Sequence, residues 1–91
     1  MSSADQIRNL LKQKLEAVTV DVDDQSDRHR GHAGATGGGG HYSVVVVSDQ
    51  FKGKPLIERH RQVYHALSEL GSEIHALTIK AYTVEETEKR K

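Results

Sequence analysis

The chain has 91 residues, with 13 basic and 13 acidic side chains and therefore zero net charge. This length allows one domain, whose core can be little more than one layer of helices on one sheet. The balanced charge excludes a global attraction to nucleic acid or to an anionic membrane, and the lack of cysteine excludes a disulfide framework. No apolar run approaches the roughly 20 residues that span a bilayer, and no targeting segment is recognisable, so we expect a cytoplasmic protein without a membrane segment.

The first segments of the chain predict a helix and then a strand. Apolar residues recur at intervals of three and four from Ile7, and Ser3 with Gln6 has the spacing of a capping box, so we expect an amphipathic helix over residues 4–17. From Val18 the apolar period changes to two, as it does in a strand with one buried face.

A long loop is expected to separate this strand from the next. Residues 25–40 contain most of the glycines and show no apolar periodicity, which predicts a loop of unusual length. His41–Asp49 is nearly continuous in valine, which predicts a central strand buried on both faces. We expect it to pair antiparallel with the first strand.

A helix and a third strand are expected next. Pro55 suits the first turn of a helix and Gly71 its end, and the face predicted to pack on the sheet consists of Leu56, His60, Val63, Tyr64 and Leu67. Ile74–Tyr82 alternates again, and a helical connection is long enough to place it parallel to the second strand.

A short charged helix is expected within residues 83–91, because Thr83 and Glu86 have the spacing of a second capping box. The predicted order is therefore α-β-β-α-β-α. It indicates an α+β two-layer sandwich in which helices cover one face of a three-stranded mixed sheet.

Histidine is the side chain of this sequence that is best suited to bind a metal ion. The chain has six histidines and no cysteine, and imidazole suits iron, zinc and copper, whereas a thiolate site cannot be built from within. Any metal must be shared with a partner or held weakly. No enzymatic activity is expected, because there is no cysteine nucleophile and the serines and carboxylates fall at caps and charged ends.

Three short motifs, read together, are similar to one family. In chain order they are Phe51-x-Gly53, then Arg59-His60-Arg61-x-Val63-Tyr64, and finally Ile74-His75-Ala76-Leu77. Their order and spacing resemble the BolA family over nearly the whole chain. The resemblance implies a single BolA-like domain over residues 1–91 with a fold similar to the class II KH arrangement.

The resemblance also implies a partner and a cofactor. The partner is a monothiol glutaredoxin, and a 2Fe-2S cluster is bridged between the glutaredoxin cysteine, glutathione and histidine from the BolA-like chain. The isolated chain is then an apo monomer, and the cluster-loaded form is a heterodimer. Its role would be cluster trafficking or sensing.

The family's ligand positions can be carried over residue by residue. Its C-terminal ligand histidine falls on His75. Its variable loop ligand falls before the second strand, where Gly31-His32-Ala33 is similar to family members that use a loop histidine. The resemblance therefore implies His75 and His32 as ligands, with His29 as the alternative to His32.

The residues alone leave other interpretations open. On a regularly alternating strand, His75 would be a half-buried structural histidine on the same face as Leu77, Ile79 and Ala81. The remaining histidines are expected to be structural at His41 and His60 and solvated at His65.

A small basic cluster offers a function of another class. It surrounds the turn before the second helix and consists of Lys52, Lys54, Arg59 and Arg61. Such residues could contact phosphates, so the alternative is a DNA-binding transcriptional regulator that uses the KH-like surface. Zero net charge and the lack of a Gly-x-x-Gly loop at this junction weaken it. A protein-interaction module without metal is a third possibility.

Overall fold

The computed structural model describes residues 3–25 and 40–89, apart from the side chains of residues 72 and 73. Its elements follow the order α-β-β-α-β-α, with two additional 3-10 helices, η3 and η4. Their bounds are α1 (Ser3–Lys14), β1 (Thr19–Asp24), β2 (Gly40–Val47), η3 (Asp49–Phe51), α2 (Leu56–Ala66), η4 (Ser68–Glu73), β3 (Ile74–Tyr82) and α3 (Val84–Lys89). The predicted α+β class and element order are confirmed, and no helix in the described part is long and apolar enough to cross a membrane.

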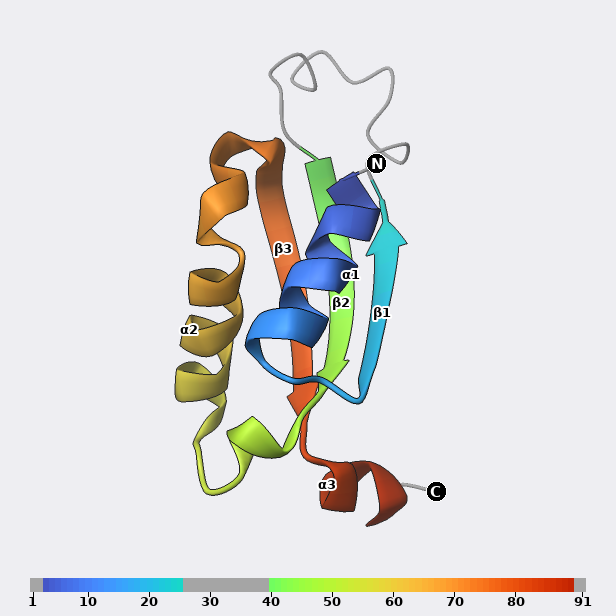
Figure 1. The fold of residues 1–91 in the computed structure, drawn as a ribbon, viewed down its shortest axis with the longest axis vertical. Coiled ribbons are helices and arrows are strands. Elements are labelled where there is room, and N and C mark those ends of the chain that lie inside the picture. Colours follow the sequence, from blue (N-terminus) through green and yellow to red (C-terminus); the bar gives the residue numbers. More distant parts are fainter. Residues whose placement is uncertain (1–2, 26–39, 90–91) are drawn as a thin grey trace.

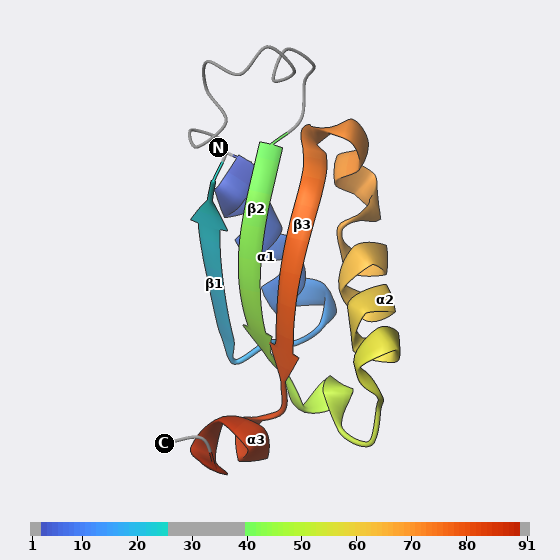
Figure 2. The same ribbon diagram turned by 180° about the vertical axis from the view of Figure 1, so that it is seen from behind.

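The three strands form one mixed sheet in the order β1-β2-β3. Strand β2 pairs antiparallel with β1 and parallel with β3, as predicted. Helix α1 lies across one face of the sheet and α2 runs along β3 (Figure 1), whereas Figure 2 shows the strands from the other side, with α1 behind them and α2 beside β3. We call this second side the open face.

The central strand β2 has one fully buried side. Its helix-facing residues Gly40, Tyr42, Val44 and Val46 are buried, whereas His41, Ser43 and Val45 on the open face are half-buried. The prediction that β2 is buried on both faces was wrong along most of its length, because α1 and α2 cover only one face. At the end of the strand Val47 is also buried.

The core lies between the sheet and the two long helices. Helix α1 contributes Ile7 and Leu11, and η3 contributes Phe51, all of them fully buried. Removing such side chains from water supplies most of the stability of a small domain. The hydroxyl of buried Ser48 donates to the Leu15 carbonyl oxygen at 2.6 Å and ties the end of α1 to the end of β2.

Helix α1 is shorter than predicted. It ends at Lys14 rather than at residue 17, and the Leu15 amide donates to the Leu11 carbonyl at 3.1 Å. Glu16 then takes a φ of 51°, a left-handed conformation that a helix cannot continue. This turn directs the chain into β1.

Helix α2 buries only part of the predicted face: Val63 and, just after the helix, Leu67 are buried as predicted. Its buried residues are Arg59, Val63 and Ala66, whereas Leu56 and Tyr64 are 63% and 54% exposed. The prediction that these two are buried against the sheet was wrong, although the Tyr64 hydroxyl donates to the Leu77 carbonyl of β3 at 3.5 Å. The helix also ends at Ala66, and Gly71 (φ 50°) turns the chain inside η4 before β3 begins.

The capping box predicted at the start of α3 is confirmed. The Glu86 amide donates to Thr83 Oγ1 at 3.1 Å, and the Thr83 amide donates to Glu86 Oε1 at 2.8 Å. The box thereby satisfies two of the amide donors at the start of this short helix, which fixes where the helix begins.

Candidate functional site

His75 lies on an irregularity at the start of β3. Gly40 is paired with Ile74, but the next residue, His41, is paired with Ala76, so His75 is an extra residue in the ladder. A bulge of this kind re-aims side chains and interrupts the alternation of faces. His75 and Ala76 are both exposed. His75 is therefore not the half-buried structural histidine that regular alternation would give and that stood as the alternative to a ligand role.

The bulge brings His75 beside His41. The centroids of the two imidazole rings are 5.1 Å apart, and the ring planes are inclined at 47°. His41 is half-buried near the start of β2, on the open face. The sequence predicted a merely structural role for His41, because the register that places the starts of β2 and β3 side by side is not visible in the sequence.

The predicted loop ligands His29 and His32 lie outside the described residues, as does most of the predicted loop over residues 25–40. The two described residues next to that segment are fixed close to the histidine pair. The Gln25 amide donates to the His41 carbonyl oxygen at 2.7 Å, and Gly40 is the first residue of β2.

Gly40 is required by its neighbour Tyr42. A Cβ atom built on Gly40 would lie 2.5 Å from the Tyr42 ring, which is closer than real side chains approach. Tyr42 is only 6% exposed, so its ring fills the space that a side chain on Gly40 would need. This packing fixes the backbone immediately before His41.

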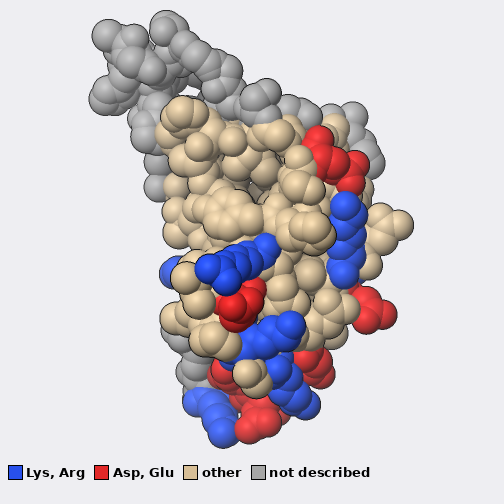
Figure 3. All heavy atoms as spheres, turned by 90° about the vertical axis from the view of Figure 1, so that its left-hand side faces the viewer, with Lys and Arg blue, Asp and Glu red and all other residues tan. Residues whose placement is uncertain are grey.

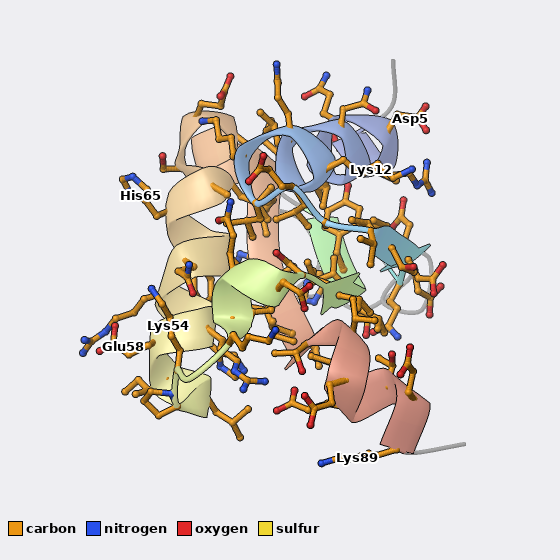
Figure 4. All side chains as sticks on the ribbon, turned by 60° about the horizontal axis from the view of Figure 1, so that its bottom comes forward. Asp5, Lys12, Lys54, Glu58, His65 and Lys89 are labelled. Atoms are coloured by element: carbon orange, nitrogen blue, oxygen red, sulfur yellow. The ribbon has the colours of Figure 1, made fainter. Side chains whose placement is uncertain are left out.

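The remaining described histidines lie on α2. His60 is half-buried, in partial agreement with the interior position predicted for it. His65 is exposed, as predicted, and Figure 4 shows it pointing away from the sheet. The structure therefore brings together His41 and His75 among the described histidines.

Arg59 does not belong to an exposed basic cluster. Its residue exposure is 8%, and the guanidinium donates from Nε to the Lys54 carbonyl at 2.8 Å and from Nη1 to the Ala81 carbonyl at 3.1 Å. Nη1 and Nη2 also donate to the two carboxylate oxygens of Glu86, at 2.7 and 3.0 Å. The prediction of Arg59 as a phosphate contact is corrected to an internal clamp that joins α2, β3 and α3.

The clamp shifts the acidity of both its members. The side-chain hydrogen bond with Arg59, together with the backbone amide of Thr83, lowers the pKa of Glu86 from its ordinary 4.5 to about 2. The same side-chain hydrogen bond raises the pKa of Arg59. Each partner thus stabilises the charged form of the other.

The other predicted phosphate contacts are on the surface. Lys52, Lys54 and Arg61 are exposed around the turn into α2, and Arg61 forms an ion pair with Glu58 at 3.2 Å. Figure 3 shows basic side chains on this side of the molecule interspersed with acidic ones, and Figure 4 shows Lys54 and Glu58 near the start of α2. The patch is local and of mixed sign.

Comparisons with known proteins support the family resemblance. A family model described as BolA-like protein matches residues 11–86. Over 83 residues the chain is 43% identical to SufE-like protein 1, chloroplastic/mitochondrial, of Arabidopsis thaliana, covering 85% of this chain and only 22% of that protein. Over 87 residues it is 40% identical to the DNA-binding transcriptional regulator BolA of Escherichia coli (strain K12), covering 90% of this chain and 80% of the relative.

A solved structure gives the same result for the fold. The BolA domain of SufE1 from Arabidopsis thaliana superposes with a TM-score of 0.79 at 41% sequence identity, covering 94% of this chain and 98% of that chain. The name of the plant relative includes chloroplast and mitochondrion. The cytoplasmic location expected from the sequence therefore stays a prediction.

Proposed function

The chain belongs to the BolA-like protein family, and we propose that it is a non-enzymatic iron–sulfur partner that supplies His75 to a 2Fe-2S cluster held by a monothiol glutaredoxin. The observation that carries this proposal is the exposure of His75 on the β3 bulge. An imidazole at the surface is accessible to iron that a second protein holds. A buried histidine on the helix-covered face would not be.

The donor set of the chain fits a shared cluster. The sequence contains no cysteine, so the thiolate ligands must come from the glutaredoxin and its glutathione. Iron of a 2Fe-2S cluster accepts imidazole in place of thiolate, as it does in Rieske centres, where the exchange raises the reduction potential. An imidazole must be neutral to bind, so protonation competes with ligation, and we expect ligation to weaken at acidic pH.

The loop segment provides the proposed second ligand. His32, with His29 as its alternative, is separated by only a few residues from Gln25, whose amide is bonded to His41. A stretch of seven residues spans at most about 25 Å, so the length of the chain between Gln25 and either histidine does not prevent it from reaching the region around His75. The proposed states are an apo monomer and a cluster-loaded heterodimer, in cluster trafficking or sensing.

The test is to mix the chain with a cluster-loaded monothiol glutaredoxin and record visible absorption and circular dichroism. We expect the spectrum to change for the wild type and to stay unchanged for His75→Ala. His65→Ala is the matched control, because this exposed histidine on α2 points away from the site. An unchanged wild-type spectrum, or an equal change in His75→Ala, contradicts the proposal.

A second candidate function is DNA binding, which is favoured by the exposed basic side chains before α2 and by the name of the Escherichia coli relative. Phosphate contacts release counterions, so affinity for duplex DNA should fall with added salt. The informative variant replaces three exposed residues by alanine: Lys52, Lys54 and Arg61. Arg59 is left intact because its guanidinium is used inside the fold.

The salt dependence of the DNA affinity distinguishes binding by this basic patch from binding by the general positive charge of the surface. Removing one side chain that binds a phosphate should reduce the slope of log affinity against log salt by about 0.9. A control variant with the same change in net charge replaces exposed lysines elsewhere, at Lys12, Lys14 and Lys80. Equal slopes for the two variants would refute a DNA-binding role for the turn before α2.

A further inference from the structure

We propose that His41 and His75 together form a site for a divalent first-row transition-metal ion such as Zn²⁺, and that the chain binds this ion without a partner protein. The inference does not depend on the cluster role proposed above. It concerns two residues on paired strands, and for one of them, His41, the sequence predicted no ligand role.

The separation of the two rings matches chelation of one ion. Zinc–nitrogen bonds are about 2.0–2.1 Å long, and an imidazole centroid lies about 1.1 Å beyond the bonded nitrogen, so two imidazoles at a tetrahedral angle place their centroids about 5 Å apart. The observed distance is 5.1 Å. Rings stacked face to face are parallel, whereas these planes are inclined at 47°.

The backbone holds the two ligands in place before an ion arrives. His41 and His75 both belong to paired strands, β2 and β3, and the partner of His41 in the ladder is Ala76, the residue after His75. The Gln25 amide holds the His41 carbonyl at 2.7 Å, and the packing of Tyr42 over Gly40 fixes the preceding residue. Binding therefore costs little of the ordering entropy that two histidines on a flexible loop would lose.

The ligand type and the exposure of the two histidines indicate which metal ions the site can bind. Neutral imidazole nitrogens suit zinc, copper, nickel and cobalt better than calcium or magnesium, which prefer oxygen ligands. His75 is exposed, so water can complete a tetrahedral shell. No group of three or more potential ligands occurs among the described residues, so the site is an open two-histidine one and the bound ion exchanges readily.

The test titrates the cluster-free chain with Zn²⁺ and, in parallel, with Co²⁺, whose visible absorption reports tetrahedral coordination. We expect one equivalent of Zn²⁺ to shift the imidazole NMR signals of His41 and His75 together, with the same midpoint. This measurement needs no variant, so it does not depend on how well a substituted chain folds. Signals of the two rings that saturate at different metal concentrations would overturn the proposal.

Variants then assign the ligands. His41→Asn and His75→Asn should each weaken Zn²⁺ binding by at least about tenfold, since removing a ligand costs no less than removing its outer-sphere support. His60→Asn and His65→Asn are the controls and should bind as the wild type does. If a variant with asparagine at both His29 and His32 no longer binds the ion while His41→Asn still does, the inference is wrong. No glutaredoxin is present in this titration, so its result neither supports nor contradicts the proposed cluster role.

Discussion

Replacing Arg59 by lysine tests whether this residue is an internal clamp or a surface contact. Lysine keeps the positive charge but lacks the planar fork that reaches several acceptors at once. In the wild type the guanidinium makes hydrogen bonds to the carbonyls of Lys54 and Ala81 and a two-pronged contact with Glu86. An ammonium group can keep one hydrogen bond to the carboxylate, so about three of these bonds are removed.

The expected cost follows from the burial of these groups. Each such bond contributes about 1 kcal/mol net, and those to charged groups about 1.5–3 kcal/mol. The side chain of Arg59 is 9% exposed but that of Glu86 is 42% exposed, so water screens the carboxylate end and the lower values apply there. We therefore expect Arg59→Lys to lower the free energy of unfolding by about 3 kcal/mol. For a domain with a total stability of about 5–15 kcal/mol this is a large decrease.

The assay is urea unfolding followed by far-UV circular dichroism. With a slope of about 1–2 kcal/mol per molar urea, the midpoint should fall by about 1.5–3 M. The control is Arg61→Lys, because Arg61 is exposed and its ion pair with Glu58 lies in solvent, which makes a change within about 0.5 kcal/mol the expected result. Equal midpoints for the two variants would refute the clamp.

Three further predictions concern the clamp, the link between α1 and β2, and the start of β2. Glu86→Gln should lower the melting temperature, and the difference in melting temperature from the wild type should be largest above pH about 4.5 and vanish as the pH falls toward about 2. The reason is that the stability that comes from the depressed pKa of Glu86 is lost as the carboxylate is protonated in the folded state. A difference that does not change with pH would contradict this assignment. Ser48→Ala should cost about 1–3 kcal/mol in urea unfolding, because it leaves the buried Leu15 carbonyl without its donor; Ser43→Ala, on the half-buried open face, is the control and should cost less. Gly40→Ala should force the Tyr42 ring to move, at a cost of about 1–3 kcal/mol and with an altered near-UV spectrum; an unchanged spectrum would show that the ring adapts without displacement.

The order of elements and the pairing of the strands could be predicted because each depends on many residues. The alternation in Ile74–Tyr82 predicted β3 with its observed bounds, and the helical connection predicted its parallel pairing with β2. The capping box at Thr83 and Glu86 is a local signal and was also correct. Patterns that extend over many residues remain recognisable because one irregular residue changes them little.

The buried face of α2 could be predicted from hydropathy only in part: Val63 and Leu67 are buried as predicted. A polarity pattern assigns a charged residue to solvent and a leucine to the core, yet Arg59 is buried and Leu56 is exposed. The guanidinium is accepted in the interior because backbone carbonyls and Glu86 satisfy it, and these partners come from segments far away in the sequence. Burial of an ion depends on such tertiary partners and not on the residue type.

The histidine pair was missed for a related reason. Pairing His41 with Ala76 adds one residue to β3, and this extra residue moves His75 out of the face that regular alternation assigns to it. A bulge leaves no periodic signal, since it is a single break between two regular stretches. The clamp of Arg59 meets β3 at Ala81, near its other end, and the intervening residues of extended strand span about 20 Å. At that distance stability and metal binding should respond independently, so the segment that anchors the fold is separate from the one that offers nitrogen ligands.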